Sequence, residues 1–223
     1  MKLTQLAIFA ITGSMLYAAS DAPKRLDAAA DTLSEIMSAP DKGIPQDLLE
    51  KAECIVVVPG LKKGAFIIGA KYGKGFMSCR KESGVGWSAP GSIRVEGGSF
   101  GFQIGGSETD VVLLVMNKSG AKKLLSSKFT VGGDASAAAG PVGRTSSAAT
   151  DAQLHAEILT YSRARGLFAG ISLEGATLRQ DDEWNKDLYG KTVSNNDVVM
   201  SNTPPPAAAS KLLAELNKYS SRK

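Results

Sequence analysis

The serine-centred segment Gly97-Gly98-Ser99-Phe100-Gly101 fits the Gly-x-Ser-x-Gly pattern of a hydrolase nucleophile. That nucleophile needs a strand before the serine and a helix after it, whereas a strand-like run, Phe102-Gln103-Ile104, follows here. The chain has one histidine, His155, so a single residue would have to serve as the base. With 24 glycines in the chain, such a match is expected by chance. We therefore expect no catalytic centre and no enzyme activity.

The small numbers of histidine and cysteine residues also limit metal binding and thiol chemistry. One histidine excludes a zinc site built on histidine pairs, and two cysteines are too few for a thiolate cage. We expect no metal and no cofactor. Cys54 and Cys79 instead predict a disulfide across about 25 residues, which would stabilise the fold by about 3 kcal/mol. The alternative is two separate buried thiols, because Cys54 opens an apolar run, residues 55–58.

Positive charge gives a stronger functional signal. Residues 54–81 contain six basic side chains and no acidic one: Lys62, Lys63, Lys71, Lys74, Arg80 and Lys81. Three arginines adjoin Gly-rich or small-residue turns: Arg144, Arg163 and Arg165. Backbone amides at such turns and arginine forks suit phosphate oxygens, so these nine residues are the candidate headgroup-binding set. A basic face that is merely solvated is the alternative.

A second lysine cluster comprises Lys118, Lys122, Lys123 and Lys128. The chain has 26 Lys and Arg against 22 Asp and Glu, a mildly basic balance. Aromatic residues make up 6%, which argues against a nucleic-acid binder that stacks bases on rings. The basic clusters therefore favour an anionic surface other than nucleic acid.

The elements that would position these side chains change in character along the chain. Residues 1–20 have the pattern of a secretory signal peptide: Lys2, an apolar run, and small residues before Asp21. We therefore expect a periplasmic or secreted protein. Apolar spacing predicts a helix over residues 21–38 and a short helix over 45–53.

Seven short Gly-punctuated strands follow between residues 54 and 116, with a tight turn at Tyr72-Gly73. After a predicted helix begun by Asp181-Asp182-Glu183 and stopped by Gly190, residues 193–206 are expected to be a linker. Residues 207–223 are expected to hold an amphipathic helix. About 200 residues remain after the leader, enough for a single domain, which we place at residues 21–192.

Four segments carry a family resemblance: FQIGGSETDVVLL at 102–114, GPVGR at 140–144, YSRARGLFAGISLEG at 161–175 and LYG at 188–190. They resemble the SYLF-domain family, which occurs beside Src-homology-3 or zinc-finger modules in eukaryotic endocytic adaptors and as secreted bacterial proteins. The resemblance implies phospholipid binding, with phosphoinositides preferred by eukaryotic members, and actin binding in some of them. Because residues 1–20 resemble a signal peptide, we do not expect actin as a partner.

The expected fold is α+β, with one curved, largely antiparallel sheet or partial barrel and flanking helices. The expected function is non-catalytic binding of anionic phospholipid headgroups at a membrane surface. We keep two alternatives: a structural or partner-binding protein of the cell envelope, and a carrier of a small apolar ligand.

Overall fold

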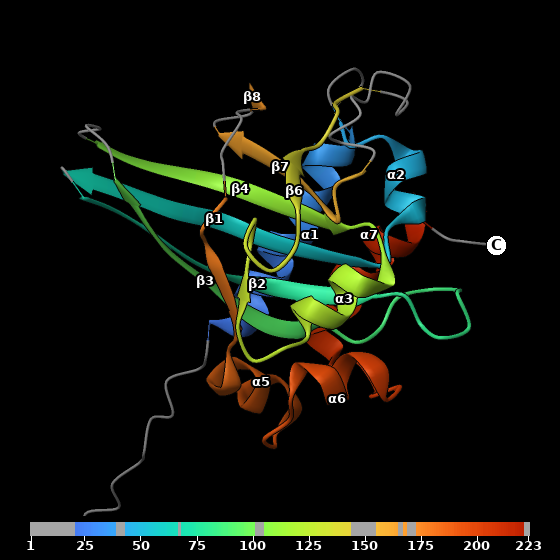
Figure 1. Cartoon of the computed structure of the whole chain (residues 1–223). Coiled ribbons are helices and arrows are strands. Elements are labelled where there is room, and N and C mark those ends of the chain that lie inside the picture. Colours follow the sequence, from blue (N-terminus) through green and yellow to red (C-terminus); the bar gives the residue numbers. More distant parts are fainter. Residues whose placement is uncertain are drawn as a thin grey trace, which may run out of the picture.

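The computed structural model describes residues 21–38, 43–66, 68–100, 105–143, 155–164, 167–168 and 173–220. A strongly curled sheet lies at its centre, with the strand order β5-β9-β3-β2-β1-β4-β7-β6 and with β8 paired to β7 (Figure 1). The β6–β7 pair is parallel, and the other pairings between the named strands are antiparallel. The α+β class, with a curved, largely antiparallel sheet in one domain, is confirmed.

Four long strands form the middle of the sheet: β1 (Cys54–Phe66), β2 (Ile68–Cys79), β3 (Gly91–Phe100) and β4 (Gly105–Val115). The prediction of many short strands is wrong, and so is the turn at Tyr72-Gly73, because both residues lie inside β2. A Cβ atom at Gly75 would lie 2.1 Å from the carbonyl oxygen of Val57. Glycine in β2 therefore permits close approach of β1 and does not end the strand.

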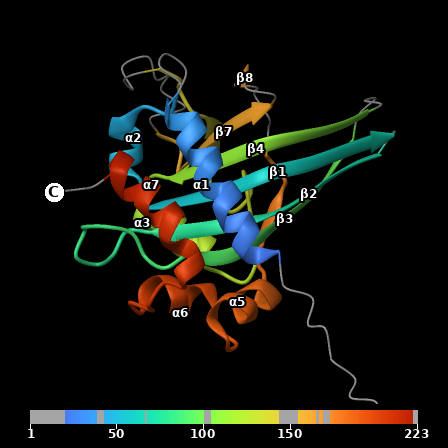
Figure 2. The same ribbon diagram turned by 180° about the vertical axis from the view of Figure 1, so that it is seen from behind.

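Strand β1 is buried on both faces of the sheet. Ile55 and Val57 belong to the core beneath three helices, α1 (Ala22–Ser38), α2 (Gln46–Lys51) and α7 (Ser210–Ser220). Val56 and Val58 belong to a second core on the opposite face. This double burial explains why the run 55–58 is continuously apolar and does not alternate. Figure 2 shows α1 and α7 crossing the sheet on the helix side.

The remaining elements close the second face and the edges of the sheet. They are α3 (Lys118–Leu124), β5 (Phe129–Thr130), β6 (Ala137–Ala139), β7 (Ile158–Ala164), β8 (Leu167–Phe168), β9 (Thr177–Gln180) and α5 (Asp182–Tyr189). Asp181 caps α5 by accepting a hydrogen bond from the Trp184 amide, and Gly190 ends the helix in the left-handed conformation, as predicted.

The expected linker at residues 193–206 is wrong. It contains helix α6 (Asn195–Met200), which begins with a capping box formed by Ser194 and Asp197. Val198 and Val199 on this helix are buried in the second core. A helix of six residues is too short for apolar periodicity to reveal. The chain continues through the 3-10 turn η2 (Ala207–Ala209) into α7, in the place of the predicted amphipathic helix.

The predicted disulfide is present and joins the open ends of the β1–β2 hairpin. Cys54 and Cys79 are directly opposite in the register, with Cα atoms 3.9 Å apart. The predicted signal peptide, residues 1–20, lies outside the described residues. Within the described part of the chain, no helix has both the length and the apolar character needed to cross a membrane.

Candidate functional site

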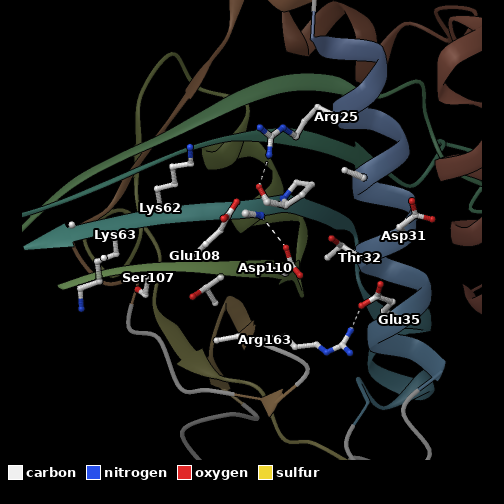
Figure 3. Close-up of a pocket in the computed structure, with 17 residues that line it drawn as sticks. Arg25, Asp31, Thr32, Glu35, Lys62, Lys63, Ser107, Glu108, Asp110 and Arg163 are labelled. Atoms are coloured by element: carbon white, nitrogen blue, oxygen red, sulfur yellow. Dashed lines mark hydrogen bonds and ion pairs between the residues drawn. The ribbon is translucent and has the colours of Figure 1, made fainter.

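A polar groove of about 1180 Å³ opens between helix α1 and strands β1, β4 and β7 (Figure 3). Three of the nine candidate cations line it, Lys62, Lys63 and Arg163, together with Arg25 of α1. We call it the α1 groove. The structure thus brings together residues that are about 100 positions apart in the sequence.

A bulge in β1 decides which face Lys62 occupies. The register of β1 against β2 shifts between Val57 and Lys62, and the pairing with β4 shifts in the same place. Gly60 lies there with φ +57°, and its amide donates a hydrogen bond of 2.9 Å to Asp110 Oδ1. The extra residue reverses the alternation of side chains. Lys62 therefore shares the helix-side face, and Lys63 points the other way (Figure 3).

Most carboxylates of the α1 groove already have partners. Glu35 pairs with Arg163 at 2.5 Å, and Asp31 pairs with Lys211 of α7 at 2.7 Å. The hydrogen bond to Asp31 raises the pKa of Lys211. Asp110 accepts from the Gly60 amide. The two acidic residues of α1 that line the groove, Asp31 and Glu35, are therefore compensated from within the fold.

Lys62 lies on the strand side of the α1 groove. Its side chain is exposed, and its cross-strand neighbours are Glu108 on β4 and Tyr72 on β2. No ion pair of Lys62 is found among the described residues. Tyr72 is itself 49% exposed, so a cation and an aromatic ring lie side by side on the open face of the sheet.

Lys63 and Lys71 form a like-charged pair on the opposite face. The register places them directly across from each other on β1 and β2. Lys71 is 7% exposed, and burial, followed by the charge of Lys63, lowers its pKa. Like charges directly opposite one another destabilise a sheet.

Lys74 and Arg80 have structural roles, because their side chains bind other parts of the fold. Lys74 pairs with the buried carboxylate of Asp181 at 2.8 Å and lies over the ring of Trp184. Arg80 is 7% exposed and stacks on Trp87. Its guanidinium donates to the carbonyl oxygens of Ala52, Leu49, Glu50 and Ser220 and to the Ser220 hydroxyl. The six cations of residues 54–81 therefore do not share one face.

Three candidates remain: Lys81, Arg144 and Arg165. Lys81 is exposed in the loop after β2 and lies at a different cavity, beside Lys118 and Lys122 of α3. Arg144 and Arg165 lie outside the described residues. Among the three candidate arginines, the structure therefore describes Arg163 alone. There the partner is Glu35, although Asp110 is the cross-strand neighbour of Arg163.

Three cations that line the two cavities are not in the candidate headgroup-binding set: Arg25, Lys118 and Lys122. The guanidinium of Arg25 donates a hydrogen bond of 3.0 Å to the Pro59 carbonyl at the bulge. Lys118 and Lys122 belong to the second lysine cluster, which the sequence showed but could not connect to Lys81. Such a connection depends on how the loop after β2 packs against α3.

The catalytic and metal-binding patterns considered in the sequence do not form an active site among the described residues. Ser99 lies in β3 opposite Gly69 of β2, so no strand-to-helix elbow surrounds it. The described residues contain no group of three or more His, Cys, Asp or Glu side chains that could hold a metal ion.

The curled half-barrel with helices on both faces defines an α+β domain whose cavities are polar or lysine-lined. Comparison with known proteins gives its family. The family model described as "Ysc84: Las17-binding protein actin regulator" matches residues 96–219, more than half of the chain. The chain belongs to this family, which is the SYLF family that its motifs resemble.

Similar proteins come from animals and fungi. SH3 domain-containing YSC84-like protein 1 is 34% identical in Rattus norvegicus and 33% in Homo sapiens, over 187 residues, 83% of this chain and 54% of each relative. LAS seventeen-binding protein 3 of Saccharomyces cerevisiae is 34% identical over 181 residues, 79% of this chain and 39% of that protein. The chain thus spans about half the length, or less, of these relatives. Their names describe binding or an SH3 domain and no catalytic activity.

Proposed function

We propose that this protein binds anionic phospholipid headgroups at a membrane surface without catalysis, through the projecting end of the β1–β2 hairpin. The observation that carries the proposal is the position of this end. Strands β1, β2 and β4 extend beyond the helices that cover the rest of the sheet (Figures 1 and 2). Residues 60–75 contain Lys62, Lys63, Lys71 and Lys74 and no acidic residue.

The side chains at this end suit the boundary between water and lipid. Lys62 is exposed and adjoins the exposed ring of Tyr72, an amphipathic pair that favours the headgroup layer. Each basic residue near an anionic surface contributes about 1 kcal/mol of attraction. Lys62 and Lys63 together would therefore supply about 2 kcal/mol. Lys74 is tied to Asp181, so we assign it no direct contact.

The proposed setting is a periplasm or the outside of a cell, as the pattern of residues 1–20 suggests. The family description names Las17 binding and actin regulation, and these stay properties of the relatives. A protein partner is the second candidate function, supported by the name of LAS seventeen-binding protein 3. Vesicle binding separates the two candidates, because a purely protein-directed domain would ignore lipid charge.

The test is sedimentation with vesicles of phosphatidylcholine alone or of phosphatidylcholine mixed with phosphatidylglycerol. We expect binding to require phosphatidylglycerol and to weaken as salt rises to physiological strength, where the Debye length is about 8 Å. The double variant Lys62→Gln/Lys63→Gln should weaken binding roughly thirtyfold, the equivalent of about 2 kcal/mol.

The matched control is Lys186→Gln/Lys191→Gln, which removes the same charge from two exposed lysines elsewhere on the surface. It should bind vesicles like the unaltered protein. Equal binding to neutral and anionic vesicles, or an equal loss in both double variants, would refute the hairpin as the contact surface.

A further inference from the structure

A second cavity, of about 750 Å³, lies at the opposite end of the hairpin, between the loop after β2, helix α3 and helix α6. The Cys54–Cys79 disulfide forms part of its wall, so we call it the disulfide cavity. Its volume is within the range of about 300–1,000 Å³ that is typical of small-molecule sites. It shares no lining residue with the α1 groove.

Helix α3 and the turn after it give this cavity a wall of mixed character. Lys118, Ala121, Lys122 and Leu125 all line it, and their spacing of three and four residues places them on one helical face. Two apolar side chains on this face, Ala121 and Leu125, are packed against the second core. Met200 of α6 lines the cavity too and remains 48% exposed. The wall therefore offers apolar surface to a ligand next to two ammonium groups.

Positive charge prevails at the rim. Lys81, Lys118 and Lys122 line the cavity, against the carboxylates of Glu53 and Glu82. For these three lysines, no ion pair is found among the described residues. The neighbouring Lys123 differs, because it pairs with Glu157 at 3.0 Å and does not line the cavity. The lysines that face the cavity are therefore the ones available to an anion.

We propose that the disulfide cavity binds an anionic amphiphile with a single alkyl chain. The anionic head lies among Lys81, Lys118 and Lys122, and the chain lies along the disulfide, Ala121, Leu125 and Met200. A fatty acid and a lysophospholipid share this chemistry. The site is separate from the hairpin contact under "Proposed function", so either can be correct without the other.

The test uses the fluorescence of 11-(dansylamino)undecanoate, which brightens when its environment becomes apolar. We expect saturable binding to the whole protein at concentrations below micelle formation. Dodecanoate and dodecyl lysophosphatidylglycerol should both displace the probe, and the stronger of the two identifies the source of the ligand. 1-Dodecanol should displace it at least tenfold more weakly, because it has no charge for the lysines.

Chain length gives an independent measure of the apolar wall. Each added methylene from octanoate to dodecanoate should strengthen displacement by up to about fourfold, the equivalent of burying one methylene. A flat series would show that the chain stays in water, and it would overturn the proposal in favour of a purely ionic contact.

Two variants locate the site. Lys118→Gln/Lys122→Gln changes exposed side chains and should weaken probe binding at least tenfold, whereas the Lys186→Gln/Lys191→Gln control should not. Ala121→Phe should fill the cavity and abolish probe binding while vesicle sedimentation persists. If Ala121→Phe strongly lowers the melting temperature, probe binding by the Lys118→Gln/Lys122→Gln variant is the decisive measurement. Absence of probe binding, or equal binding in all variants, overturns the proposal.

Discussion

The two ends of the β1–β2 hairpin differ in what covers them, although both carry basic residues. At the end near α2 and α7, the Cys54–Cys79 disulfide joins β1 to β2, and the buried guanidinium of Arg80 joins the sheet to both helices. At the projecting end, the side chains of Lys62 and Tyr72 are exposed, and Lys62 lines the α1 groove. A basic residue in a strand therefore acquires its role from the elements packed over it.

Arg80 illustrates the covered end. It bonds to carbonyl groups at the end of α2 and at Ser220, the last described residue of α7. These are groups that a helix end leaves without partners, so the guanidinium links two helices to the sheet. Lys62 makes no such link. Its loss should therefore affect binding, whereas the loss of Arg80 should affect folding.

The largest expected effect is that of Arg80→Met, which leaves several buried acceptors without a donor. We expect the free energy of unfolding to fall by about 4 kcal/mol, measured by urea denaturation. Arg80→Lys should recover part of this loss, because one ammonium cannot match the fork of the guanidinium. Vesicle binding by the folded fraction should not change. A stable Arg80→Met variant that fails to bind vesicles would reverse the assignment of the two ends.

Removal of the disulfide comes next. Cys54→Ala/Cys79→Ala should lower the free energy of unfolding by about 3 kcal/mol, because the unfolded chain regains the freedom of a 25-residue separation. Treatment of the unaltered protein with a reductant during urea unfolding should give a similar loss. Since the disulfide lies far along the strands from Lys62, vesicle binding should persist below the unfolding transition. Loss of binding in the native state would show that the two ends are coupled.

A smaller effect is expected at the α1 groove. Arg163→Ala breaks the ion pair with Glu35, whose side chain is largely exposed, and should lower stability by about 1 kcal/mol or less. The uncompensated Glu35 should weaken binding to anionic vesicles a few-fold. Arg163→Ala/Glu35→Ala should restore binding, because both charges are then absent. A single variant that unfolds without altering the binding of its folded fraction would make Arg163 a structural tie alone.

The smallest effect concerns the like-charged pair. Burial and the charge of Lys63 lower the pKa of Lys71 in the folded protein. Between that lowered pKa and the ordinary value, the unfolded chain binds more protons than the folded one, so stability rises with pH in this window. Lys63→Gln should raise the pKa of Lys71 and reduce this slope. Titration of the Lys71 side chain by NMR measures the shift, and an unchanged pKa would leave burial as its sole cause.

Much of the fold follows from local pattern. The apolar stripe of residues 22–38 predicts α1, the β-prone runs predict an antiparallel sheet, and two cysteines on β-prone runs predict their disulfide. These features depend on periodicity and composition, which act over a few neighbouring residues. Helix α6 was not predicted, because it has six residues and lies in a segment that contains Pro and Asn. Such a short segment shows too little apolar periodicity to identify Val198 and Val199 as core residues.

Local sequence patterns predict the class of fold, the family motifs and the excess of basic over acidic residues along residues 54–81, and they favour the disulfide over two separate thiols. The roles of those cations depend on the tertiary structure. The bulge at Gly60 turned Lys62 to the face of the α1 groove, helix ends enclosed Arg80, and α3 placed two lysines beside Lys81. The physical reason is that the residue type fixes the charge of a side chain, whereas its burial and its partners depend on segments that are distant in sequence.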